Sequence, residues 1–141
     1  MSGYLLDTNC ISEVVRPNPE PRVLRWLEAT DERQLHLSVL TLGEIRKGVA
    51  ALPLSKRRMH LESWLELELP ARFSGRILSI NVAIADRWGI LAADAKRAGV
   101  SLATIDGLLA ATALHLNLTL VSRNVTDFAS TPVSLFDPWT A

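Results

Sequence analysis

Three acidic residues occupy positions where a carboxylate does not match its neighbours. Asp7 stops the short apolar run Tyr4–Leu6, and Asp106 is the only Asp, Glu, Lys or Arg within residues 101–117. Glu44 directly follows Gly43, which is a poor residue for a first helical turn unless something must approach the backbone closely. Because an unpaired carboxylate is costly to bury, Asp106 should meet a cation, a cluster of hydrogen-bond donors or a helix N-terminus.

Each of these carboxylates also has an ordinary structural explanation. Asp7 can be a turn residue at the end of a strand. Asp106 can complement the helix dipole in the first turn after a Thr104 cap. Glu44 completes the sequence Thr41-Leu-Gly-Glu44, which matches a capping box in which the Glu side chain bonds back to the amide of the cap. The residues alone leave both interpretations open.

Two more polar residues, Asn124 and Asp127, follow the apolar run 118–121 in a loop that strand order could place beside Asp7. Side chains at strand ends, or in the first turn of the next helix, can converge at the carboxyl edge of a parallel sheet. Oxygen ligands of this kind suit Mg²⁺ or Mn²⁺, and the three scattered histidines offer no competing set. With no obvious nucleophile, such a site predicts attack by water and activation by a metal ion.

Alternating short apolar runs and amphipathic helices predict an α/β fold with a short central parallel sheet, in a single domain covering residues 1–141. The expected strands are residues 4–6, 34–39, 76–80, 118–121 and 133–136. The expected helices are residues 9–15, a short helix from residue 21, 41–52, 55–69, 82–98 and 104–116. We expect Asn9 or Thr8 to cap the first helix, Asn81 to cap the helix that Gly99 closes, and Asn117 to end the last helix in a left-handed conformation.

Composition places the chain among ordinary globular proteins. It has 141 residues, 48% of them hydrophobic, which is enough to bury a core without disulfides. No run approaches the roughly 18 apolar residues that would span a bilayer, and the start lacks the pattern of a signal peptide. We therefore expect a cytoplasmic protein in which the only cysteine, Cys10, is a small buried hydrophobe.

The formal net charge is zero, but the charges are unevenly distributed along the chain. Between Arg33 and Leu61, six basic residues accompany one acid, Glu44, so this sector carries an excess of positive charge and the remainder an equal excess of negative charge. A basic sector beside an acidic remainder is typical of a nucleic-acid enzyme with a carboxylate site. A solvated helix face explains any one of these charges equally well.

Four segments, in order along the chain, resemble the PIN domain family. They are Leu-Leu-Asp7-Thr-Asn, Leu-Gly-Glu44-Ile-Arg, Ile-Asp106-Gly-Leu-Leu-Ala-Ala-Thr-Ala and Val-Ser-Arg-Asn124-Val-Thr-Asp-Phe. Together with the closing Phe-Asp-Pro-Trp139, they make the chain similar to the VapC/FitB-like toxins of bacterial toxin–antitoxin pairs. The resemblance covers nearly the whole chain and implies a PIN-like fold.

The resemblance also implies a function. In that family the acids corresponding to Asp7, Glu44 and Asp106 bind Mg²⁺ or Mn²⁺ for endonucleolytic cleavage of RNA. The residues that would then contact the RNA are Thr8, Arg46, Lys47 and Arg123, with the basic run 56–58 as a further contact to the backbone.

The chain departs from the FitB-like pattern at its fourth acid. The aspartate of that pattern falls on Asn124, while Asp127 stands three residues further on. Either Asn124 acts as a neutral ligand or positioner, or Asp127 takes the role of the missing acid. Because a neutral Asn would weaken a second cation site, both one-metal and two-metal sites stay open.

Two other functions compete with the ribonuclease. A phosphatase of the haloacid-dehalogenase type would use Asp7 as nucleophile, but such enzymes want a second Asp where this chain has Asn9. A non-catalytic module for binding nucleic acid or a partner would keep the fold, and only the substitution at Asn124 favours it. Phosphodiester cleavage with and without a chelator distinguishes the three.

The four tryptophans suggest protein partners. Trp26, Trp64 and Trp88 fall on amphipathic helices, and we expect so many large rings to exceed what a core of this size can hide. Since Trp is favoured at interfaces, we expect a homodimer. The family resemblance adds a cognate antitoxin whose C-terminal segment wraps the toxin.

Overall fold

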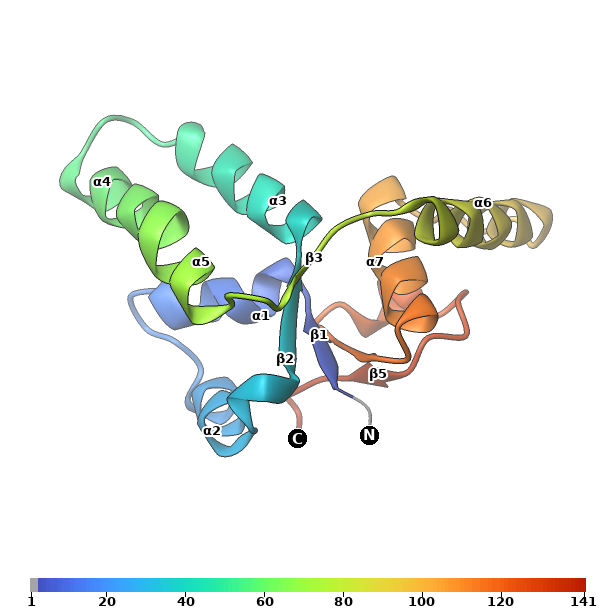
Figure 1. Cartoon of the computed structure of the whole chain (residues 1–141), viewed down its shortest axis with the longest axis horizontal. Helices are drawn as coiled ribbons and strands as arrows, with labels where there is room; N and C mark the ends of the chain where they lie inside the picture. Colours follow the sequence, from blue (N-terminus) through green and yellow to red (C-terminus); the bar gives the residue numbers. More distant parts are fainter. Residues whose placement is uncertain (1–2) are drawn as a thin grey trace.

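The structure, a computed structural model, describes residues 3–141 and is built on one parallel sheet (Figure 1). Its five strands lie in the order β3-β2-β1-β4-β5. They are β1 Tyr4–Leu6, β2 Leu35–Ser38, β3 Ile77–Leu78, β4 Thr119–Val121 and β5 Leu135–Phe136. All four neighbouring pairs are parallel, which confirms the predicted α/β fold with a short central sheet.

Helices make up most of the remaining chain. The α-helices are α1 Thr8–Ser12, α2 Pro21–Ala29, α3 Val39–Ala50, α4 Lys56–Ser63, α5 Leu69–Arg72, α6 Val82–Arg97 and α7 Thr104–His115. Shorter 3₁₀ turns are η1 Glu13–Val15, η2 Glu32–Gln34 and η4 Val125–Phe128. A π-helical segment, η3 Trp64–Glu68, joins α4 to α5, so the helix predicted from residue 55 runs on past its expected end.

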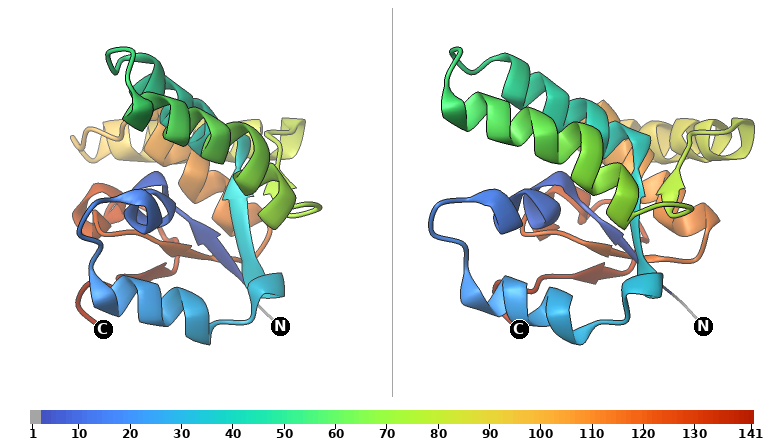
Figure 2. Two further views of the ribbon diagram at one scale, coloured as in Figure 1. Left: turned by 90° about the vertical axis from the view of Figure 1, so that its left-hand side faces the viewer. Right: turned by 60° about the vertical axis from the view of Figure 1, so that its left-hand side comes forward.

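The two faces of the sheet carry separate hydrophobic cores, because successive strand residues point to opposite sides. Leu6 and Val121 belong to one core, which α1 to α5 complete. Leu5 and Leu120 belong to the other, which α6, α7 and η4 complete. Figures 1 and 2 show these two groups of helices on opposite sides of the sheet. The tips of the strands lie between the two layers, where polar residues can be placed.

The ends of two helices match the sequence prediction. Gly99 follows α6 with φ 72°, and Asn117 follows α7 with φ 55°, both in the left-handed region expected of them. Asn81 caps α6 as predicted, accepting a hydrogen bond from a backbone N–H three residues on, at 2.9 Å. The start of α7 differs from the prediction. Thr104 is its first residue, and Ala103 occupies the cap position without a side-chain bond.

The predicted capping box at the start of α3 is wrong. Ser38 is the cap, and its hydroxyl accepts a hydrogen bond from the backbone N–H of Leu40 at 3.1 Å. The helix starts directly at the end of β2, so Thr41 already lies inside it. Glu44 consequently has no cap to reach back to, and its carboxylate is free for another partner.

The core buries two of the four tryptophans and covers the other two only in part, so the expectation that they exceed its capacity is met in part. Trp64 and Trp139 are buried, with 8% and 7% of their surface exposed, while Trp26 and Trp88 are half-buried. Trp88 lies over Gly107, where an added Cβ would come within 2.8 Å of the indole Cδ1 atom.

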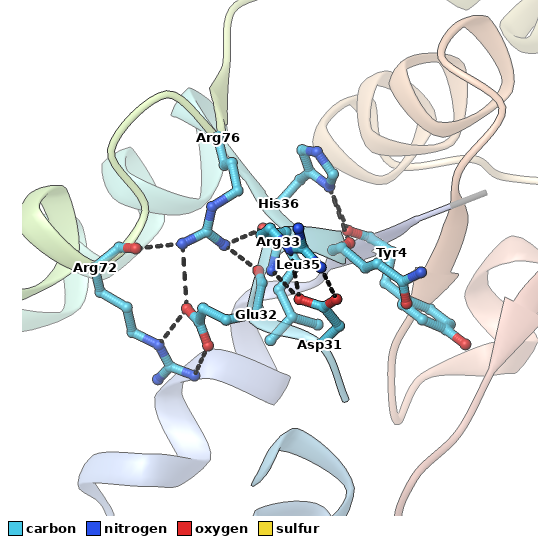
Figure 3. Close-up of polar contacts among 9 residues, drawn as sticks. Tyr4, Asp31, Glu32, Arg33, Leu35, His36, Arg72 and Arg76 are labelled. Atoms are coloured by element: carbon cyan, nitrogen blue, oxygen red, sulfur yellow. Dashed lines mark hydrogen bonds and ion pairs between the residues drawn. The ribbon is translucent and has the colours of Figure 1, made fainter. Parts of the chain in front are cut away.

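A network of arginines and carboxylates braces the amino end of the sheet (Figure 3). Arg72 donates two hydrogen bonds to the Glu32 carboxylate, at 2.9 and 3.1 Å, and Arg76 donates a third at 3.3 Å. Both guanidinium groups also lie over the ring of Phe73, at 5.2 and 5.0 Å from its centroid. These contacts tie α5 and the start of β3 to the segment before β2.

Cys10 is fully buried, and burial raises the pKa of its thiol to about 12, so it is the small hydrophobe that was predicted. No helix in residues 3–141 combines the length and apolar character needed to span a membrane.

Candidate active site

Asp7 lies at the carboxyl end of β1 and caps α1. Its Oδ1 accepts a hydrogen bond from the backbone N–H of Thr8, and its Oδ2 accepts one from the hydroxyl of Ser122, both at 2.8 Å. The predicted cap, Asn9 or Thr8, is wrong because the strand passes into the helix without a connecting turn. The residue at the strand tip is therefore also the cap, and only 6% of its surface is exposed.

Ser122, which the sequence analysis did not select, joins the tips of β1 and β4. Its fully buried hydroxyl donates to Asp7 and accepts from the side-chain amide of Asn9 at 3.3 Å and from the backbone N–H of Asn124 at 3.0 Å. The side-chain Oδ1 of Asn9 accepts a hydrogen bond from the backbone N–H of Arg123 at 3.3 Å. The sequence signal that could have identified Ser122 is its position as a hydroxyl residue directly after the buried strand β4. This network holds the Asp7 side chain in one orientation.

Glu44 reaches the same edge of the sheet from α3. Its Oε1 accepts a hydrogen bond from the hydroxyl of Thr8 at 2.6 Å, and its side chain is half-buried. Thr8, predicted as an RNA contact, therefore uses its only hydroxyl proton on a carboxylate. The bond joins α1 to α3 next to Asp7.

Asp106 lies in the first turn of α7, and its pKa is raised to about 6. Burial is the main cause, followed by the negative charges of Asp7, Asp127 and Glu44. The pKa of Asp7 is also raised, because burial outweighs the hydrogen bonds that it accepts, and the charges of Glu44 and Asp127 add to the effect. Asp7 and Asp106 are therefore within electrostatic reach of each other, and both are within reach of Glu44 and Asp127.

The two candidates for the fourth acid have different environments. Asn124 directly precedes η4, and its side chain makes no capping hydrogen bond there. Its backbone N–H is the part that contacts Ser122. Asp127 lies in the first turn of η4 and adds negative charge at both Asp7 and Asp106. The negative charge in this loop therefore comes from Asp127.

The chemistry of these donors fits a hydrated divalent cation. Within residues 3–141, no three Asp, Glu, His or Cys side chains stand at the spacing of direct ligands to one metal ion. Mg²⁺ typically keeps several waters and takes one or two protein carboxylates, so it does not need a closed cage. Burial first, and the neighbouring acids second, raise the pKa values of Asp7 and Asp106, and a bound cation would offset both effects.

The basic sector on α3 and α4 is partly neutralised within the molecule. Arg46 pairs with Glu66 at 2.8 Å and with Glu62 at 3.9 Å, and Arg58 pairs with Glu62 at 3.6 Å. The helix formed by α4 and η3 is basic at its start and acidic at its end, which is unfavourable for its dipole, and these ion pairs offset part of that cost. Lys47 is exposed, and no acid in the described part of the chain pairs with it. Of the two predicted RNA contacts on α3, Arg46 and Lys47, Lys47 is therefore the more available to bind a phosphate.

The sheet, its two helical layers and the carboxylates at its carboxyl edge define a parallel α/β protein with an acidic site. The family model described as PIN domain matches residues 4–133. The chain therefore belongs to the PIN domain family.

Individual relatives extend over almost the full chain. It is 38% identical over 135 residues to Toxin FitB of Neisseria gonorrhoeae, covering 96% of this chain and 97% of the relative. It is 34% identical over 135 residues to VapC ribonuclease Y4jK of Sinorhizobium fredii, covering 96% of each. The crystal structure of FitAcB from Neisseria gonorrhoeae superposes with a TM-score of 0.93 at 38% identity, covering 98% of this chain and 99% of that one. The resemblance to VapC/FitB-like proteins is confirmed.

Proposed function

We propose that this chain is a metal-dependent endoribonuclease and the toxin of a type II toxin–antitoxin pair, acting in the cytoplasm. The observation that carries the proposal is the gathering of four carboxylates at the carboxyl edge of the sheet: Asp7, Glu44, Asp106 and Asp127. The toxin and ribonuclease names of its relatives support it.

The proposed roles follow from the contacts of each side chain. Asp7 and Asp106 bind a hydrated Mg²⁺ or Mn²⁺, and Glu44 assists directly or through water. When bound, the cation supplies Lewis acidity that polarises the phosphate and makes water a stronger nucleophile. Ser122 and Thr8 orient Asp7 and Glu44 through the hydrogen bonds at 2.8 and 2.6 Å.

A cleavage assay tests the proposal. Single-stranded RNA should be cut internally in Mg²⁺ or Mn²⁺, and EDTA should stop the reaction until the cation is restored. A matched reaction with p-nitrophenyl phosphate tests the phosphatase alternative. RNA binding without cleavage in either cation would favour the non-catalytic module instead.

We further propose that Asp127 provides the negative charge that Asn124 lacks. Asp127→Asn should weaken Mn²⁺ binding by roughly threefold to tenfold, because it removes a charge acting through a partly solvated site. Asn124→Asp should add a charge beside it and tighten binding of a second Mn²⁺. Calorimetric titration of both variants measures the two effects. Unchanged Mn²⁺ affinity in Asp127→Asn would assign this loop a structural role only.

The proposed partners are a second copy of the chain and a cognate antitoxin. A basic side chain from the antitoxin could offset the repulsion among the carboxylates and exclude the cation. A peptide of the antitoxin C-terminus should therefore lower Mn²⁺ affinity and RNA cleavage together, measured by calorimetry and by the cleavage assay. Two results would contradict these proposals: the protein stays a monomer at high micromolar concentration, and the product of the neighbouring gene does not bind it.

A further inference from the structure

The closing segment Phe-Asp-Pro-Trp139 takes no part in the proposed site, although it ends at the same edge of the sheet. β5 runs parallel to β4, with Phe136 in register with Val121, so the residues after both strands emerge together. The backbone N–H of Trp139 donates to the Asp137 carboxylate at 2.8 Å, which closes a turn. Beyond this turn the Trp139 indole is buried in the same core as Leu6 and Val121.

Arg123 lies over this indole. Its Cζ atom is 5.7 Å from the centroid of the Trp139 ring, within the range of a cation–π contact. Its backbone N–H is held by Asn9, so the residue starts from a fixed point one position after Ser122. The side chain is exposed, and no carboxylate in residues 3–141 forms an ion pair with it. In the described residues, the Arg123 guanidinium therefore contacts the Trp139 ring and no carboxylate.

The other stacked arginines of the described chain differ in their charge partners. Arg72 and Arg76 lie over Phe73, but their N–H groups are occupied by the Glu32 carboxylate (Figure 3). The guanidinium of Arg123 lies over a ring, and its N–H groups have no hydrogen-bond or ion-pair partner among the described residues. A guanidinium can stack through its face and bind a phosphate through its edge at the same time.

We propose that Trp139 is a positioning residue that holds Arg123 ready to bind an RNA phosphate beside the acidic site. The inference rests on the proposed RNA cleavage. Four carboxylates repel a phosphate. The Arg123 guanidinium beside them therefore has to be held where the RNA can reach it and where the acids do not neutralise its charge. An aromatic ring restricts the guanidinium without cancelling its charge, whereas a carboxylate partner would cancel it.

A double-mutant cycle on the full chain tests this coupling. The probe is a fluorescein-labelled single-stranded RNA, with the dissociation constant measured by anisotropy in EDTA and with KM and kcat measured in Mn²⁺. Arg123→Ala should weaken binding roughly tenfold by removing a charged hydrogen-bond donor. Trp139→Leu should weaken it about threefold by freeing the guanidinium. The double variant should bind no worse than Arg123→Ala alone, and KM should change more than kcat.

Three further variants separate positioning from loss of core packing. Trp139→Phe keeps a ring and should retain most of the affinity. Trp26→Leu removes another tryptophan packed against the same core and should lower the melting temperature without changing RNA affinity. Arg123→Lys leaves the core untouched and keeps the charge but loses the planar stacking group, so it should weaken binding about as much as Trp139→Leu.

The outcomes distinguish this inference from the proposed function. Additive losses in the double variant, or wild-type affinity in Arg123→Lys, overturn the positioning role even if RNA is cleaved. Equal losses in Trp26→Leu and Trp139→Leu also overturn it, because the effect is then one of core packing. A wild-type protein that neither binds nor cleaves RNA overturns both proposals.

Discussion

Replacing Asp7 or Asp106 by asparagine should reduce RNA cleavage by about a thousandfold or more, because each change removes a negative charge from the proposed cation site. The measurement is kcat/KM for a labelled RNA in saturating Mn²⁺, with growth inhibition on expression as a second readout. The asparagine keeps the size and shape of the side chain, so the fold should be retained.

Asp86→Asn provides the matched control, since Asp86 is an exposed acid on α6 outside the site. It should cleave RNA like the wild type. Without metal, the two site variants should be at least as stable as the wild type, because clustered carboxylates repel one another. Cleavage at the wild-type rate in either site variant would refute the metal-binding role of that residue.

Lowering the pH below 6 should reduce cleavage by about tenfold per pH unit, since a protonated carboxyl cannot bind the cation. Asp106 titrates in this range, because burial and the neighbouring acids raise its pKa to about 6, and Asp7, whose pKa is also raised, adds to the fall. The measurement is kcat/KM from pH 4.5 to pH 8 at a fixed, subsaturating Mn²⁺ concentration. Raising the Mn²⁺ concentration should move the fall to lower pH, because cation and proton compete. If the pH profile does not change with the Mn²⁺ concentration, the group that titrates is not a cation ligand and the assignment to Asp106 is wrong.

The same pKa predicts the opposite trend for the stability of the metal-free protein. Between the ordinary value of 3.8 and about 6, the folded state binds more protons at Asp106 than the unfolded state does. The contribution of Asp106 to the free energy of unfolding therefore falls as the pH rises through this window. Allowing for solvent screening of a half-buried group, the loss is about 1 kcal/mol. Urea unfolding in EDTA should show this loss in the wild type and a smaller loss in Asp106→Asn, where the raised pKa of Asp7 remains.

Local sequence was sufficient for the elements whose limits depend on near neighbours. Gly99 and Asn117 have the positive φ that ends a helix, and Asn81 caps α6. Helix starts were predicted less well where a strand passes directly into a helix. At Asp7 and Ser38 the last residue of the strand region is also the cap, and periodicity does not show where one element becomes the other.

Hydrogen bonds between distant residues lie beyond local patterns altogether. Leu6 is in register with Val121, so the next residues, Asp7 and Ser122, meet across 115 positions of the chain. The bond from Thr8 to Glu44 crosses 36 positions in the same way. A small hydroxyl residue has no periodic signature, so Ser122 was not selected.

Asp7 and Asp106 could be selected from the sequence, because each is a carboxylate among apolar neighbours, and Glu44 because it follows a glycine in a first helical turn. Which groups surround these acids depends on contacts between distant residues and followed only from the fold. The parallel register of β1, β4 and β5 brings Ser122 to Asp7 and Trp139 to Arg123. Burial and mutual repulsion, which raise the pKa values of Asp7 and Asp106, arise only once the acids share one edge of the sheet.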